Sequence, residues 1–80
     1  MTPAMNIHAV VGLNVSRLRT MRGLTQQELS SQAGLSRHYL VGIEAGMRNP
    51  SIEILAKLAD ALGVKVEALV KDVRPAAVDR

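Results

Sequence analysis

The sequence contains no cysteine, no tryptophan and no phenylalanine, and one tyrosine is its only aromatic residue. Without cysteine, disulfides and thiolate metal sites are excluded within this chain. Hydrophobic residues still make up 48% of it, so the core must be aliphatic. Such a core favours helices packed on helices over a β-sandwich, which usually draws on aromatic and β-branched residues.

Long hydrophobic runs are also missing. No apolar run approaches the ~20 residues needed to span a bilayer. The first twelve residues, MTPAMNIHAVVG, have no lysine or arginine ahead of a hydrophobic stretch. We therefore expect no membrane partner, no signal peptide and a cytoplasmic protein. A length of 80 residues predicts one domain, at 7–72, between flexible tails at 1–6 and 73–80. This length leaves no room for a sensor domain. No small-molecule ligand or cofactor is therefore expected.

The positive charge is unevenly distributed along the chain. The net charge is +3, and residues 1–48 carry all of the excess, as five arginines against two glutamates. Residues 49–80 carry equal numbers of basic and acidic side chains. The planar fork of arginine suits phosphates and guanine edges. An ordinary solvated surface would give the same distribution, so charge alone leaves both interpretations open.

Apolar spacing and helix-capping residues predict five short helices and no strand. The first runs from about residue 7 to 22 and ends at Gly23. The second begins with the capping box of Thr25 and Glu28 and ends near Ala33. The others are a helix from about 36 to 44, a helix capped by Ser51 and closed by Gly63, and a short fifth helix near residues 66–70. The expected fold class is a compact all-α domain.

The most informative segment is QQELSSQAGLSRHYLVGIEAG, residues 26–46. It reads as two short helices joined by a tight turn at Gly34, where glycine would adopt a positive φ without steric cost. The apolar residues that must face inward are Leu29, Ala33, Leu35, Leu40 and Ile43. The third helix then presents long polar side chains at its start and a small residue one turn later. This pattern is typical of a helix that enters the DNA major groove.

Three runs of this sequence resemble those of a known protein family. The runs RLRTMRGLTQQELSSQAGLS, YLVGIEAG and RNPSIEILAKLADALGV, between about Val11 and Leu69, resemble the lambda-repressor-like (Cro/cI-type, xenobiotic-response-element) helix-turn-helix regulators. The resemblance implies a five-helix DNA-binding domain with the helix-turn-helix at the second and third helices. Arg37-x-Tyr39 with the later Arg48-Asn49 is similar to controller proteins of restriction-modification systems, although prophage and plasmid regulators share it.

The resemblance also implies a role for each matching residue. The residues expected at base edges are Ser36, Arg37, His38 and Gly42. The residues expected at DNA phosphates are Gln26, Gln27, Tyr39, Arg48 and Asn49. Arg19 and Glu44 are expected to form a partly buried ion pair. The sequence departs from the family pattern at Ser30, usually alanine, and at Gly42, where many relatives carry a base-reading side chain.

Several of these residues have a second interpretation. Arg37 suits either a bidentate contact with guanine or a phosphate, and the Tyr39 ring could also cover the edge of the core. His38 could simply be exposed, and no metal site is expected because His8 is the only other histidine. The residues that exceed what a short fifth helix needs to bury are Val64, Val66, Leu69 and Val70. They are either core or, as we expect, a dimer seam.

These features together predict a homodimer that binds double-stranded palindromic operator DNA at the nucleoid and regulates its own transcription. Two alternatives stay open: the antitoxin of a toxin-antitoxin pair, with residues 64–80 on the toxin, and a protein-binding adaptor with the same fold. An enzyme is not expected, because no aspartate precedes Asp60 and no Ser, His and carboxylate set is visible.

Overall fold

The computed structural model describes residues 6–72, and five helices account for the regular structure of that range. They are α1 (Ile7–Met21), α2 (Gln26–Ala33), α3 (Arg37–Glu44), α4 (Ile52–Leu62) and α5 (Glu67–Val70). The expected tail at 73–80 and residues 1–5 of the expected tail at 1–6 lie outside the described residues. Asn6, which the sequence predicts in the N-terminal tail, instead caps α1, because its Oδ1 accepts the His8 N–H at 2.8 Å.

Side-chain caps explain why the helices begin where the sequence predicts. Thr25 Oγ1 accepts the Glu28 N–H at 3.0 Å, and the Glu28 carboxylate accepts the Thr25 N–H at 2.8 Å. Ser36 and Ser51 cap α3 and α4 in the same way, through the backbone N–H three residues later. Each cap satisfies a donor that has no partner within its helix. The predicted all-α class is confirmed, with helix ends within one or two residues.

The turn between α2 and α3 also has the expected conformation. Gly34 ends α2 with a φ of 71°, as predicted. The Leu35 N–H then donates to the Ser30 carbonyl at 2.8 Å and closes the turn. Ser30 is itself fully buried, and its hydroxyl donates to the Gln27 carbonyl at 2.9 Å. Because this polar group is paired inside its own helix, serine fits where relatives usually have alanine.

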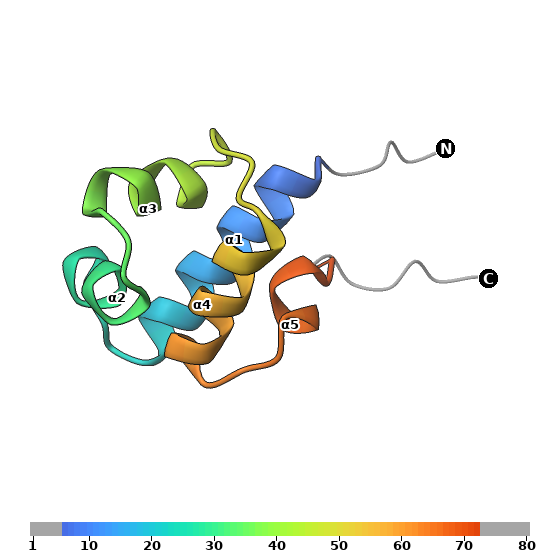
Figure 1. Cartoon of the computed structure of the whole chain (residues 1–80). Helices are drawn as coiled ribbons and strands as arrows, with labels where there is room; N and C mark the ends of the chain where they lie inside the picture. The colour runs from blue at the N-terminus through green and yellow to red at the C-terminus, as the bar shows by residue number, and fades with distance from the viewer. Residues whose placement is uncertain (1–5, 73–80) are drawn as a thin grey trace, which may run out of the picture.

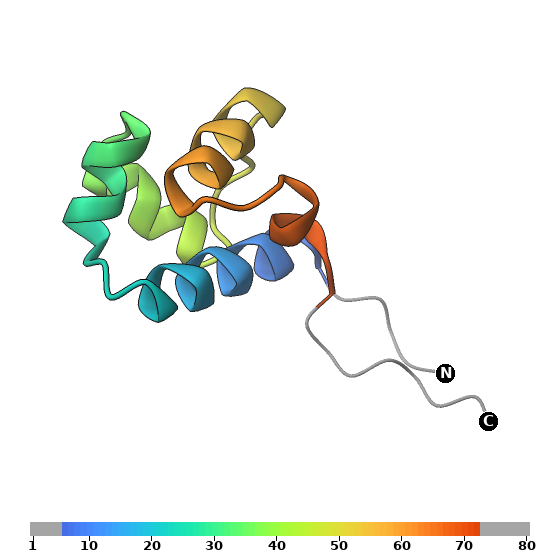
Figure 2. The same cartoon turned by 90° about the horizontal axis from the view of Figure 1, so that it is seen from below.

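The helices enclose one aliphatic core. Figure 1 shows α2 and α3 together at one end of the molecule and α5 at the other, and Figure 2 shows α1 running beneath the other helices. Helix α1 contacts α3, α4 and α5, while α2 contacts α3 and α4. The buried core cluster comprises Val11, Val15, Leu29, Ala33, Leu40, Ile43, Leu55, Leu58, Ala59, Leu62 and Leu69. No helix within residues 6–72 combines the length and the apolar character needed to cross a membrane.

The structure corrects part of the expected dimer seam. Leu69 is completely buried within its own chain, so it has no surface to offer a partner. Asn14 of α1 holds α5 in this position, because its Nδ2 donates to the carbonyls of Leu69 at 3.0 Å and Lys71 at 2.7 Å. Val64 and Val66 are half-buried against the same core. Val70 alone of the four predicted seam residues is exposed.

Candidate nucleic-acid interface

The outer face of α3 carries the side chains that the sequence places there. Arg37 and His38, in its first turn, are exposed. Leu40 and Ile43 on the opposite side are 0% and 1% exposed and join α3 to the core. Figure 1 accordingly shows α3 at the edge of the fold. A short helix anchored along one side therefore presents a basic first turn to solvent.

Ser36 stands at the start of this face and already has one structural duty. Its Oγ accepts the Tyr39 N–H at 3.1 Å, which uses a lone pair of the hydroxyl. The hydroxyl hydrogen is not used by that bond. The side chain is exposed, so it can still donate to an acceptor outside the protein while it caps α3.

The first turn of α2 contributes two glutamine side chains. Gln26 is half-buried, and its Nε2 donates to Glu44 Oε1 at 3.1 Å, which leaves one amide hydrogen for another acceptor. Gln27 is exposed, and its Nε2 donates to Ser31 Oγ at 3.2 Å. The start of a helix favours anions because its backbone N–H groups and dipole are directed outward there.

A partly buried ion pair joins α1 to the end of α3. Arg19 Nε lies 2.7 Å from Glu44 Oε2, and its Nη2 lies 3.1 Å from Oε1. Its Nη1 donates to the Leu24 carbonyl at 2.8 Å. The two side chains are 17% and 7% exposed, so this is the pair that the resemblance implies, in a forked geometry. It neutralises a carboxylate that would otherwise stand beside a surface expected to meet phosphates.

The loop after α3 returns across the helix. The Met47 N–H donates to the Gly42 carbonyl at 2.8 Å and ties the loop to α3. Arg48 then lies over Tyr39, with its Cζ 5.8 Å from the ring centroid. Arg48 and Asn49 are exposed and Tyr39 is half-buried. The Tyr39 ring packs against the core, so the structural interpretation of this residue is correct. An outward role for its hydroxyl stays a prediction.

Gly42, which the resemblance places at base edges, lies beneath the Arg48 side chain. It is half-buried, and a Cβ atom added to it would lie 2.8 Å from Arg48 Cγ. The space that a side chain at this position would fill is therefore occupied by Arg48. This arrangement depends on the path of the loop, so the sequence pattern of α3 alone does not reveal it.

Sequence reasoning also missed two residues of α1. A Cβ atom on Gly12 would lie 2.6 Å from the carbonyl oxygens of Ile43 and Glu44, so glycine allows α3 to approach α1 closely. Asn14 is completely buried. The sequence does contain a feature that points to Asn14, because this polar residue interrupts the apolar stripe of the first helix that contains Val15. The same described range, residues 6–72, has no group of three or more histidine and acidic residues that could hold a metal ion.

Comparison with known proteins agrees with this geometry. Residues 15–69 match the family described as helix-turn-helix. An HTH-type transcriptional regulator of Sinorhizobium fredii, y4dJ, is 46% identical over 66 residues, which cover 82% of this chain and 86% of the relative.

Solved structures show the same fold. The restriction-modification controller protein C.AhdI from Aeromonas hydrophila superposes with a TM-score of 0.76 and 39% identity, covering 78% of this chain and 94% of C.AhdI. SinR, a master regulator for biofilm formation solved in complex with DNA, gives a TM-score of 0.73 and 34% identity over 76% of this chain and 98% of SinR. The chain therefore belongs to the helix-turn-helix family of DNA-binding transcriptional regulators, with a fold of the lambda-repressor-like kind.

Proposed function

We propose that this regulator binds a palindromic operator as a homodimer and controls its own transcription at the nucleoid, in the cytoplasm. The observation that carries the proposal is the exposure of Arg37 and His38 on a helix whose other side is locked into the core. An α-helix with its side chains is about 10–12 Å across, which matches the ~12 Å width of the major groove.

The remaining candidate residues lie on the segments before and after this helix in the chain. Gln26 and Gln27 begin α2, and Arg48 and Asn49 lie in the loop that follows α3. In the proposal these flanking groups bind phosphates and set the position of α3, while Ser36, Arg37 and His38 contact base edges. A bidentate contact of Arg37 with guanine would contribute about 1–3 kcal/mol of discrimination.

A homodimer would place two copies of α3 in successive major grooves, about 34 Å apart. Val70 supports a seam at α5, because it is 39% exposed and α5 lies at the end of the molecule opposite α2 and α3 (Figure 1). Dimerisation makes operator occupancy depend steeply on protein concentration, which is the variable an autoregulator needs. The HTH-type name of the S. fredii relative and the DNA complex of SinR support the DNA-binding part of the proposal.

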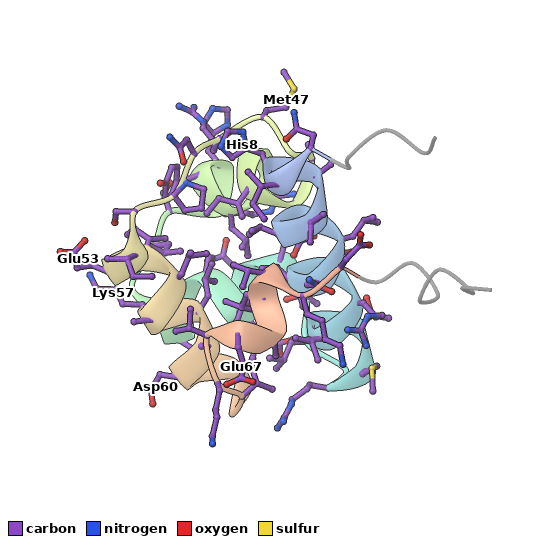
Figure 3. The ribbon with its side chains drawn as sticks, turned by 90° about the vertical axis from the view of Figure 1, so that its right-hand side faces the viewer. His8, Met47, Glu53, Lys57, Asp60 and Glu67 are labelled. Atoms are coloured by element: carbon purple, nitrogen blue, oxygen red, sulfur yellow. The ribbon has the colours of Figure 1, made fainter. Side chains whose placement is uncertain are left out.

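Selection from random duplexes at one stated salt concentration tests this function. The wild type is expected to enrich a palindrome, and Arg37→Ala is expected to lose the preference for at least one base in each half-site. Lys57→Ala is a matched control, because it removes one positive charge from the exposed side of α4, where Glu53 and Asp60 also project (Figure 3). No enrichment by the wild type would refute the proposal and favour a protein-binding adaptor.

The dimer needs a separate measurement. Sedimentation equilibrium of the wild type is expected to show a dimer, and Val70→Lys is expected to shift it toward monomer because it places a charge in the apolar seam. Ile52→Lys is the control, since Ile52 is a more exposed apolar residue on a different helix, at 64%. Monomer in the wild type, with or without operator DNA, would contradict the dimeric arrangement.

A further inference from the structure

We propose that Gly42 is a positioning residue for Arg48. Its missing side chain leaves a seat, formed by Gly42 and Tyr39, in which the arginine lies across the second turn of α3. This inference rests on the proposed DNA-binding function and adds a residue pair that sets specificity. The guanidinium held there would bind paired acceptor atoms of DNA, either on a guanine edge or on a phosphate.

The contact between the two residues is close. A Cβ atom on Gly42 would lie 2.8 Å from Arg48 Cγ and 3.1 Å from its Nε. Real Cβ atoms essentially never come within 3.0 Å of such a neighbour, so a side chain at position 42 requires a shift, and the contacting atoms all belong to the Arg48 side chain. In the proposal, a side chain at position 42 therefore moves Arg48 out of the place it occupies over glycine.

The Tyr39 ring completes the seat. The Arg48 Cζ lies 5.8 Å from the ring centroid, within the range of a cation–π interaction. Tyr39 is held in turn by its packing against the core. A long side chain that is restrained before binding loses less conformational entropy when it meets its ligand. The free protein thus presents Arg48 already in place.

The seat lies on the side of α3 that faces outward. Residues four apart on a helix share a face, so position 42 follows His38 by one turn. Arg37 and His38 are exposed in the first turn, and Arg48 is exposed across the second. Among residues 6–72 no carboxylate lies within ion-pair distance of Arg48. Arg48 thereby supplies a cation beside position 42, where glycine has no side chain of its own.

The first experiment needs no DNA. Tyr39 is the only phenylalanine, tyrosine or tryptophan of the chain, so ring-current shifts on the Arg48 methylene protons in NMR spectra report on its ring once the imidazole of α3 is removed by measuring every variant also with His38→Ala. In the wild type these protons are expected upfield of their random-coil positions. Gly42→Ala is expected to return them toward those positions, as Tyr39→Leu must. Unchanged Arg48 signals in Gly42→Ala would overturn the seat whatever the protein binds.

The second experiment is a double-mutant cycle on the operator selected by the wild type. Arg48→Ala and Gly42→Ala are each expected to weaken binding about 10-fold, and the double variant is expected to bind no more weakly than Arg48→Ala. Additive losses, or wild-type affinity of Gly42→Ala, would overturn the proposal. Alanine favours a helix interior over glycine, so the Tm of Gly42→Ala is expected to stay level or rise, which excludes unfolding as the cause.

Two readouts identify the acceptor. A guanine edge predicts that both single variants lose the same base preference in selected sites, and that Arg48→Lys keeps the charge but not that preference. A phosphate predicts an unchanged base profile and a salt slope reduced by about 1 in both variants. Different changes in the two variants would overturn the pairing. If the wild type selects no sequence, the proposed function fails, while the NMR arm still decides the seat.

Discussion

Gly12 of α1 lies directly against the backbone of Glu44 at the end of α3, where an added Cβ atom would fall 2.6 Å from the Glu44 carbonyl oxygen. The same atom would lie 2.6 Å from the Ile43 carbonyl oxygen. Backbone atoms cannot move aside as a flexible side chain can. This contact therefore sets the distance between α1 and the helix that we expect to read DNA.

Gly12→Ala is expected to lower the free energy of unfolding by about 1–3 kcal/mol, because the added Cβ atom overlaps backbone atoms of α3 and forces α1 and α3 apart. Helix propensity alone would act in the opposite direction, by roughly 0.5–1 kcal/mol in favour of alanine. The sign of the change in urea denaturation is therefore decisive. Gly42→Ala is the matched control, since it is also a helical glycine but faces the Arg48 side chain. A more stable Gly12→Ala variant would contradict the contact.

Asn14 is expected to be needed for the docking of α5. Removing its amide leaves the Leu69 and Lys71 carbonyls without this donor, one of them in a buried site. Asn14→Ala should cost about 1–3 kcal/mol of unfolding free energy. Asn14→Asp should cost more, because it turns carboxylate oxygens toward those carbonyls. Chemical denaturation measures both, and the exposed Asn49→Ala is expected to stay within about 0.5 kcal/mol of the wild type. Equal effects of Asn14→Ala and Asn49→Ala would argue against this role.

Breaking the ion pair from its basic side is expected to be costly. Arg19→Met leaves the Glu44 carboxylate, which is 7% exposed in the wild type, with Gln26 as its remaining donor. The loss should be about 3 kcal/mol, the lower end for a buried pair, because these side chains are not fully enclosed. Arg19→Met with Glu44→Gln should recover part of that loss, since no charge is then left unpaired. Denaturation of the two single variants and the double variant completes a cycle. A double variant less stable than Arg19→Met would refute the explanation.

The salt dependence of the DNA-binding constant should distinguish contacts made by neutral side chains from contacts made by charged ones. The logarithm of the binding constant is expected to fall with the logarithm of salt concentration, with a slope of about −0.9 for each neutralised phosphate. Gln27→Ala should weaken binding to all duplexes alike and leave this slope unchanged, because it removes no cation. Fluorescence anisotropy titrations at several salt concentrations measure both quantities. A changed slope, or a changed base preference, would exclude a simple phosphate contact for Gln27.

Local sequence signals predict the helices well because each depends on residues close in the chain. The Thr25–Glu28 capping box acts across three residues. Gly34 needs only its own backbone to adopt a φ of 71°. The apolar spacing of α3 shows its inner side, so the outward placement of Arg37 and His38 was also predictable. The main features of the candidate interface were accordingly visible in the sequence.

Contacts between distant segments were not predictable in this way. The bond from Asn14 to Leu69 joins residues 55 positions apart. Leu69 looks like a seam residue until α5 is seen to pack on α1. Likewise, nothing in the spacing of α3 places Arg48 over Gly42, because the loop between them sets that contact.

Local residue patterns are enough to establish which segments are helical, where they start and stop, and which side of each is apolar. Periodicity, caps and glycine conformations are short-range properties, and neighbouring residues carry them. The assembled helices are needed to show which apolar residues are enclosed, how closely α3 approaches α1, and what covers Gly42. These depend on where separate helices and loops meet in space, so packing across the whole domain settles them.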